Sequence, residues 1–210
     1  MIENHLRRRG IKDERVLDAM ARIPRHEFVP PEWTSKAYSD HPLPIGEGQT
    51  ISQPYIVALM TEALLLPAES RILELGTGSG YQTAILCMMG AEVWTIERSP
   101  LLSASARARL EEQGFERAHC ITGDGTMGLA PQAPFDRIVA TGSLPSVPKP
   151  LLQQLRLGGI LVGPIGHRAE QSLRRVTYHP AGSKEENLGL CRFVPLIGAA
   201  GWSDRGSATD

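Results

Sequence analysis

The sequence is poor in cysteine and in aromatic residues, and it has no long apolar run. Only 3 of its 210 residues are Cys, and aromatic residues make up 5%. Because Cys87, Cys120 and Cys191 are odd in number and outside any C-x-x-C motif, we expect buried free thiols and neither disulfides nor a zinc site. No stretch approaches the roughly 18 apolar residues of a membrane span, and the N-terminus has no signal-peptide core. We therefore expect a cytoplasmic protein that does not bind membranes.

An excess of charge of either sign is also missing. The 22 basic and 23 acidic side chains give a net charge of −1, so no overall field attracts nucleic acid. The one dense basic run, Arg7 to Arg9, is short, and we expect it to be a solvated face. The six histidines are scattered, and there is no H-E-x-x-H motif, no G-x-S-x-G motif and no cluster of metal ligands. The sequence thus predicts no metal site.

The middle of the chain alternates between strand and helix patterns. The predicted strands are residues 71–75, 91–97, 119–122, 135–140 and 159–166, and the predicted helices are residues 79–89, 100–113 and 147–155. Helices between consecutive strands imply right-handed crossovers. The sequence therefore predicts an α/β fold with a mainly parallel sheet.

The N-terminal part of the chain has a different pattern. In residues 12–23 the apolar side chains Val16, Leu17, Met20 and Ile23 share one face of a predicted helix. A proline-rich connector follows, so we expect a helical lead-in up to about residue 40.

The C-terminal part also departs from the alternation. Residues 171–179 and 189–198 have no helix between them, so we expect them to pair as an antiparallel hairpin at the sheet edge. We expect residues 203–210 to be a frayed tail. The whole chain is predicted to be one domain, with a lead-in and substrate segment over residues 1–52 and a core over residues 53–202.

Three glycines at alternate positions follow the first predicted strand. Residues 72–81 read ILELGTGSGY, and Gly76, Gly78 and Gly80 let a ligand lie against bare backbone at a helix N-terminus. A dinucleotide fingerprint, G-x-G-x-x-G, would need glycine where Tyr81 stands, which disfavours a pyrophosphate site. A glycine-rich turn without a ligand stays open as the alternative.

Acidic residues follow the next two predicted strands. Glu97 ends one strand close to the spacing at which a carboxylate meets ribose hydroxyls in nucleoside sites. Asp124, in the run GDG, could accept a hydrogen bond from an adenine amino group. Each is also an ordinary turn former, but together they line the edge at which a parallel sheet binds its ligand.

The run EGQTISQPY, residues 47–55, raises a question about one hydroxyl. Ser52 precedes Pro54 and an apolar helix pattern, and serine is a favoured N-cap. On the residues alone, a capping role is favoured over a role in chemistry.

Taken together, LELGTGSGY, Glu97 and GDG resemble the class I methyltransferases that use S-adenosylmethionine. The runs GQTISQP, APFDRIV and RFVPLIGAAGW extend the resemblance to the protein-L-isoaspartate O-methyltransferase family over residues 13–202. This resemblance implies a Rossmann-like, doubly wound sheet with an N-terminal helical addition. It also implies methylation of the α-carboxylate of isoaspartyl residues in exposed segments of damaged proteins, with repair through a succinimide.

The resemblance also assigns roles to individual residues. Ser52 matches the family's active-site hydroxyl, a role compatible with capping. The residues that match the cofactor site are Thr50, Ile51, Glu74, Gly76, Thr77, Gly78, Glu97, Asp124 and Gly125. Because a carboxylate with a pKa of about 4 is already ionised at pH 7, no general base is required. Ser52 would then donate a hydrogen bond that orients the acceptor.

One segment departs from the family pattern. At the end of the fourth strand, small alanines usually follow a threonine, whereas this chain reads TGSLP over residues 141–145. We expect these residues to border the acceptor site, so another carboxylate acceptor in a dedicated peptide or small molecule stays open. A module that binds the cofactor without turnover is a separate alternative, against which the intact GQTISQP argues. His41 lies in the same region as Ser52, and we assign it no role. A monomer is favoured.

Overall fold

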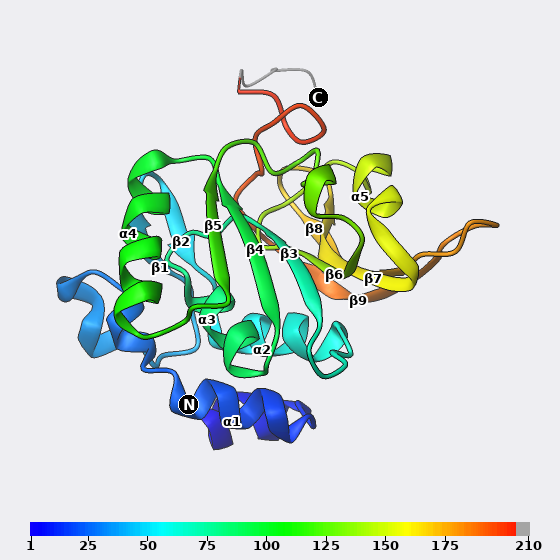
Figure 1. Ribbon diagram of the computed structural model, residues 1–210. Coiled ribbons are helices and arrows are strands. Elements are labelled where there is room, and N and C mark those ends of the chain that lie inside the picture. Colours follow the sequence, from blue (N-terminus) through cyan, green and yellow to red (C-terminus); the bar gives the residue numbers. More distant parts are fainter. Residues whose placement is uncertain (205–210) are drawn as a thin grey trace.

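Seven strands form one central sheet. The strands are β3 (Arg71–Leu75), β4 (Glu92–Glu97), β5 (Ala118–Thr122), β6 (Phe135–Ala140), β7 (Leu155–Gly166), β8 (Gln171–Thr177) and β9 (Lys184–Cys191). In the computed structural model, which describes residues 1–204, their order is β5-β4-β3-β6-β7-β8-β9 (Figure 1). The neighbouring pairs β5–β4, β4–β3, β3–β6 and β6–β7 are parallel, while β7–β8 and β8–β9 are antiparallel. The predicted sheet, with its antiparallel C-terminal edge, is confirmed.

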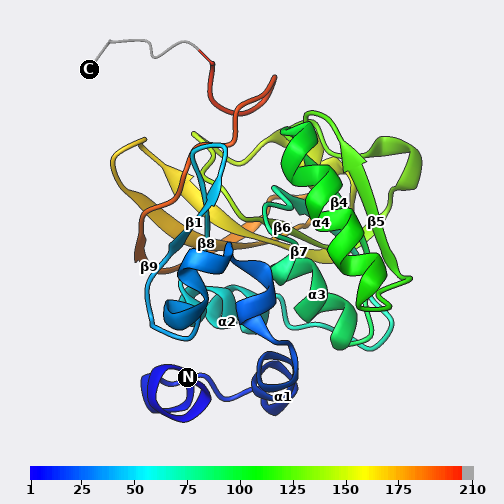
Figure 2. The ribbon, with the colours of Figure 1, turned by 90° about the vertical axis from the view of Figure 1, so that its left-hand side faces the viewer.

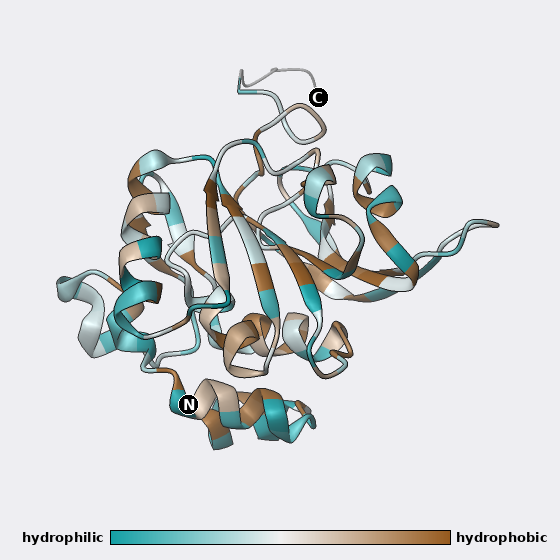
Figure 3. Cartoon of the chain, viewed as in Figure 1, coloured by the Kyte–Doolittle hydropathy of each residue, from teal (hydrophilic) through white to brown (hydrophobic). Residues whose placement is uncertain are grey.

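Helices cover both faces of the sheet. They are α2 (Pro54–Ala63), α3 (Tyr81–Met88), α4 (Pro100–Glu112), α5 (Lys149–Gln153) and the single turn η5 (Ala130–Gln132). Because side chains alternate along a strand, Ile72 packs into the core beside α2 and α3, whereas Leu73 and Leu75 pack on the other side with Leu151 of α5. Figure 3 shows the apolar residues concentrated on the central strands. The fold is therefore Rossmann-like and doubly wound.

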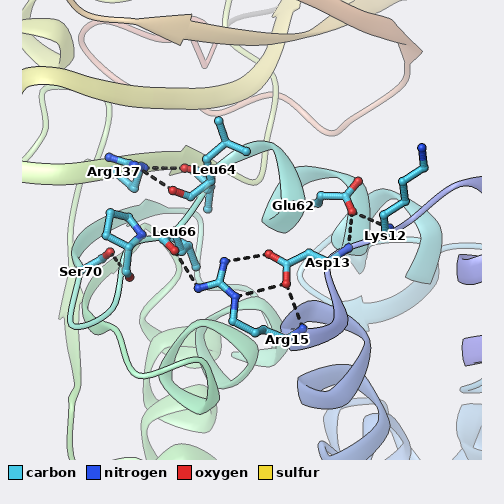
Figure 4. Close-up of polar contacts among 10 residues, drawn as sticks. Lys12, Asp13, Arg15, Glu62, Leu64, Leu66, Ser70 and Arg137 are labelled. Carbon is cyan, nitrogen blue, oxygen red and sulfur yellow. Dashed lines mark hydrogen bonds and ion pairs between the residues drawn. The ribbon is translucent and has the colours of Figure 1, made fainter.

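The N-terminal lead-in packs against this core as an outer layer. It comprises η1 (Ile2–Leu6), η2 (Arg7–Arg9), α1 (Glu14–Arg22), η3 (Arg25–Phe28) and η4 (Pro31–Lys36). The four apolar side chains predicted to share one face of a helix are all buried, and α1 contacts α2 and α3 (Figure 2). The Glu62 carboxylate of α2 accepts hydrogen bonds from the N–H groups of Lys12 (2.6 Å) and Asp13 (2.7 Å) (Figure 4).

A short hairpin that the sequence analysis missed follows the lead-in. Strands β1 (Leu43–Gly46) and β2 (Gln49–Ile51) pair antiparallel around Glu47 and Gly48. Both turn residues have positive φ, +52° and +67°, the combination found in type I′ turns. The local signal was a glycine-containing pair between two short apolar runs. This hairpin delivers Thr50 and Ser52 to the carboxyl edge of the sheet.

The C-terminal prediction needs one correction. Within residues 1–204 the last strand is β9, so the run RFVPLIG, which was predicted to belong to it, lies instead beyond its end. That segment crosses the carboxyl edge of the sheet, where Ser143 N–H donates to the Val194 carbonyl (2.8 Å) and Leu196 N–H to the Ser143 carbonyl (2.9 Å). Of the predicted frayed tail, Ser203 and Asp204 are held, because Ser203 accepts from Arg168 (2.8 Å) and Asp204 pairs with Arg98. Residues 205–210 lie outside the described residues.

The cysteines and the helices bear on two further expectations. The three cysteines are free, as predicted, but they are half-buried and not fully buried. Burial raises the pKa of Cys87 to about 12 and those of Cys120 and Cys191 to about 11, so these thiols stay protonated at neutral pH.

None of the helices within residues 1–204 is long and apolar enough to cross a membrane.

Candidate active site

The carboxyl ends of β3 and β6 lie side by side in the sheet. From β3 the chain continues to β4 and β5 on one side, and from β6 to β7 on the other, so the strand order reverses between β3 and β6. Sheets of this kind bind their ligands at the carboxyl ends of the strands at such a point. Gly76, directly after β3, has φ +92°. A Cβ placed on it would lie 2.6 Å from Oγ1 of Thr141, directly after β6. The Thr141 hydroxyl donates to the carbonyls of Leu75 (3.0 Å) and Gly76. Only glycine therefore permits this close approach of the two strand ends.

A cavity of about 380 Å³, here called the glycine-loop cavity, opens at this edge. Its lining includes five residues predicted to bind the cofactor, namely Thr50, Gly76, Gly78, Glu97 and Gly125. The Glu97 carboxylate accepts hydrogen bonds from the N–H groups of Gly78 (2.9 Å) and Ser99 (2.9 Å). Because a carboxylate offers about four acceptor positions, Glu97 keeps capacity for a ligand.

Two segments distant in sequence cover this cavity. From the β1–β2 hairpin, the Glu47 carboxylate accepts a hydrogen bond from the Ser99 hydroxyl at 3.3 Å. From the other side, residues 194–197 complete the lining. A Cβ on Gly142 would lie 2.8 Å from Cγ of Leu196, so glycine at this position lets the C-terminal segment cross.

A second space, here called the outer cleft, has a volume of about 700 Å³. It lies between the start of α2, strands β8 and β9, and residues 192–195. It shares Thr50, Thr141, Val194 and Pro195 with the glycine-loop cavity, so the two spaces meet at these residues. Ser52 lines the outer cleft but not the glycine-loop cavity.

The segment that carries Ser52 is held by buried polar contacts. The N-cap of α2 is Gln53 and makes no side-chain capping bond, so the capping role considered for Ser52 is wrong. Asp40 takes that role from outside the helix, accepting from Tyr55 N–H (3.1 Å) and from the Gln53 side chain (2.8 Å). Arg25, which is fully buried, donates from Nη2 to the Ser52 carbonyl (2.7 Å) and from Nε to the Ala37 carbonyl (2.8 Å).

Four predicted cofactor residues lie behind the glycine-loop cavity and do not line it. Ile51 and Thr77 line a pocket of about 40 Å³ on the inner side of the glycine loop, and the Thr77 hydroxyl is 2.6 Å from that of Thr95. Glu74 is fully buried and accepts from the Thr83 hydroxyl (2.5 Å). The Asp124 carboxylate faces away, accepting from Thr126 N–H (2.8 Å) and Ala199 N–H (2.7 Å).

The two carboxylates among these four have opposite pKa shifts. Burial raises the pKa of Glu74 to about 7, against the hydrogen bond from Thr83, which lowers it. Partial burial acts in the same upward direction on Asp124, but hydrogen bonds from Ala199 and Thr126 outweigh it and hold the pKa of Asp124 below its ordinary value. Asp124 is thus an ionised anchor for the C-terminal segment.

Comparisons with known proteins decide the family. The model of the protein-L-isoaspartate(D-aspartate) O-methyltransferase family matches residues 1–201. The chain belongs to this family.

Relatives of similar length agree with the assignment. The chain is 50% identical over 202 residues to protein-L-isoaspartate O-methyltransferase 1 of Syntrophobacter fumaroxidans, covering 96% of this chain and 94% of the relative. It is 51% identical over 199 residues to protein-L-isoaspartate O-methyltransferase of Dictyoglomus thermophilum, covering 95% and 90%.

Solved structures of the family share the fold. One protein-L-isoaspartate O-methyltransferase superposes with a TM-score of 0.84 at 28% identity, covering 95% of this chain and 67% of its own. A Plasmodium falciparum protein assigned to the same activity, in complex with S-adenosyl-L-homocysteine, gives a TM-score of 0.81 at 26% identity and 93% and 96% coverage.

Within this methyltransferase family, the departure TGSLP has a structural explanation. Thr141 borders the outer cleft, as predicted for the whole run, and Gly142 lines the glycine-loop cavity. The prediction is wrong for Ser143 and Leu144, which are fully buried and pair with Val194 and Ile165 through backbone contacts. Ser143 holds the C-terminal segment, Leu144 pairs with β7, and neither buried side chain faces an acceptor. His41 is exposed and contacts only the Pro42 carbonyl (3.1 Å) among the described side-chain hydrogen bonds.

The sequence analysis missed the residues that hold and cover the site. Arg25 and Asp40 lie in a proline-rich connector whose pattern gives no indication of burial or capping. Val194 and Pro195 were assigned to a strand because of their apolar character. The available local signal was Pro195 itself, since proline disfavours a paired strand interior.

Proposed function

We propose that this protein transfers a methyl group from S-adenosylmethionine to the free α-carboxylate of L-isoaspartyl residues in damaged proteins and peptides, which starts repair through a succinimide. The observation that carries the proposal is the meeting of two spaces at Thr50 and Thr141, with Ser52 lining the outer cleft and not the glycine-loop cavity. A reaction between a cofactor and a separate acceptor requires two such spaces with a narrow junction. Membership of the family supplies the identity of the acceptor.

The glycine-loop cavity fits the cofactor in size and chemistry. Its volume of about 380 Å³ lies within the range of small-molecule sites, about 300–1,000 Å³. Backbone at Gly76 and Gly78 lines the cavity, and the spare acceptor positions of Glu97 suit the vicinal hydroxyls of a ribose. The bound cofactor would supply an electrophilic methyl group on a sulfonium. We propose that Glu74, Thr77 and Ile51 support the loop from behind and that Asp124 fixes the C-terminal cover.

On the acceptor side, we propose that the residues orient the acceptor carboxylate and do not need to deprotonate it. A carboxylate is ionised at neutral pH, so the chain has no proton to remove. We propose that the Ser52 hydroxyl donates to one carboxylate oxygen and aims the other at the junction. Correct orientation alone can remove roughly 7–11 kcal/mol of barrier in favourable cases. A single neutral donor also avoids stabilising the acceptor more than the transition state, in which its charge is being lost.

A labelling experiment tests the proposed function. The protein is incubated with methyl-labelled S-adenosylmethionine and two matched peptides, one with isoaspartate and one with aspartate at the same position. We expect label in the isoaspartyl peptide, released as methanol in mild base. Equal labelling of both peptides, or none while the cofactor still binds, contradicts the proposal.

A further inference from the structure

The outer cleft has an unusual charge for this chain. Its lining contains Arg9, Arg168 and Arg192 and, among the residues that the structure describes, no Asp or Glu. The chain as a whole has slightly more acidic than basic side chains, 23 against 22. The cleft is therefore a local positive region on a nearly neutral protein.

One of the three arginines is already neutralised. Nη1 of Arg9 lies 2.5 Å from Oδ2 of Asp40, and its guanidinium stacks 3.6 Å from the centre of the Tyr55 ring. Because Asp40 also caps α2, this ion pair belongs to the framework that holds the Ser52 segment. Arg9 contributes little net charge to an incoming molecule.

The other two arginines keep their charge. Arg168 donates to the Ser203 carbonyl (2.8 Å) and stacks over the Trp202 ring at 5.2 Å, contacts that orient it, and it makes no ion pair with the residues that the structure describes. Arg192 follows the edge strand β9, is exposed, and makes no hydrogen bond or ion pair through its side chain within residues 1–204. Leu190, 71% exposed, stands beside it in the same lining.

The chemistry of the proposed reaction explains why such charges would stand at the rim and not at the junction. Methyl transfer removes the negative charge of the acceptor, so a cation in contact with it would stabilise the ground state more than the transition state. A cation at the cleft mouth instead raises the capture of anionic segments without that penalty. Ser52, a neutral donor, is half-buried, whereas both arginines are exposed.

Resting on the proposed function, we propose that Arg168 and Arg192 form a cationic rim that selects isoaspartyl segments carrying a further carboxylate close to the damaged residue. The partner is an extended, flexible acidic peptide segment. The rim acts on the encounter and on the bound state of the peptide, so its effect falls on KM and leaves kcat unchanged.

The test uses three sets of isoaspartyl peptides, with a single Glu, Gln or Lys placed in turn at each of the two positions on either side. We expect the lowest KM for the Glu peptide and the highest for the Lys peptide at the responsive position. The KM of the Lys peptide divided by that of the Glu peptide should be about three- to tenfold at low salt and should shrink at high salt. Arg192→Gln, alone and with Arg168→Gln, lowers this ratio toward one. Arg192→Glu reverses the preference.

Arg117→Gln is the matched control, because Arg117 is exposed just before β5, at the opposite edge of the sheet. It should leave every ratio unchanged. If the KM ratio between the Lys and Glu peptides persists in the double variant while the Gln peptide is still methylated, the proposal of a cationic rim is overturned and the proposed function stays intact. Failure of the wild-type protein to methylate any isoaspartyl peptide overturns both.

Discussion

The glycine-loop cavity and the outer cleft are built in different ways. The first is made mainly of backbone and short side chains at the ends of β3, β4, β5 and β6, whose positions the parallel sheet determines. The second is made of segments far apart in the chain, from Arg9 to Pro195, whose positions depend on packing and buried polar contacts. Damage to the first should therefore act on cofactor binding, and damage to the second on the acceptor, seen in kcat or in the KM for the peptide.

The largest effect is expected at Gly76. Gly76→Ala places a methyl group 2.6 Å from Oγ1 of Thr141, at a backbone φ of +92° that side chains rarely adopt. Because the strained backbone at position 76 and the Thr141 side chain must both shift, we expect cofactor affinity to fall by more than about 100-fold, measured by calorimetric titration with S-adenosylhomocysteine.

Gly90→Ala separates the two causes in that prediction. Gly90 has nearly the same φ, +90°, but a Cβ there meets nothing within 4 Å. Backbone strain alone should lower its thermal stability and leave cofactor affinity unchanged. Equal loss of affinity in both variants would contradict the close-approach argument.

A second effect concerns the pH dependence of stability. The pKa of Glu74 is about 7 in the folded protein, above its unfolded value near 4.5, so the folded state retains a proton that the unfolded chain loses. The free energy of unfolding therefore falls as pH rises from about 4.5 through 7, by on the order of 3 kcal/mol. Glu74→Gln should remove this loss and be more stable than wild type at pH 8 but not at pH 4.5, as measured by urea unfolding.

The exposed Glu116→Gln serves as the control for that charge change. It should leave the wild-type pH dependence in place. A stability difference between Glu74→Gln and wild type that is equal at both pH values would mean that Glu74 does not titrate there.

Ser52→Ala probes the outer cleft without touching the glycine-loop cavity. Loss of the orienting donor should lower kcat by more than about tenfold, with cofactor affinity nearly unchanged. Initial rates with an isoaspartyl peptide and calorimetric titration with S-adenosylhomocysteine measure the two quantities. Full activity in this variant would remove Ser52 from the mechanism.

The same contrast explains what the sequence could and could not predict. The sequence placed Gly76 and Glu97 at the edge where they line the glycine-loop cavity, because strand ends and turns leave local patterns and parallel pairing brings those ends together. Glu74 and Asp124 were placed on the correct edge, but which way a carboxylate turns depends on partners such as Thr83 and Ala199 that are distant in sequence. The crossing of residues 194–197 over the cavity likewise depends on tertiary contacts with Ser143.

The smallest effect is expected at Arg25, and it tests the link between the lead-in and the outer cleft. Arg25 is fully buried, and its bonds to the carbonyls of Ala37 and Ser52 require a forked donor that lysine lacks. Arg25→Lys should lower kcat by roughly three- to tenfold by loosening the Ser52 segment, with cofactor affinity retained.

A double-mutant cycle distinguishes positioning from a general loss of stability. If Arg25 acts through the Ser52 hydroxyl, Arg25→Lys should cost no further kcat in a protein that already carries Ser52→Ala, because the oriented group is gone. Arg137→Lys is the matched control, since Arg137 donates to the Leu64 (2.5 Å) and Leu65 (2.8 Å) carbonyls at the far end of α2 (Figure 4). It should lower thermal stability without lowering kcat. Additive losses from Arg25→Lys and Ser52→Ala would instead mean that Arg25 supports the fold alone.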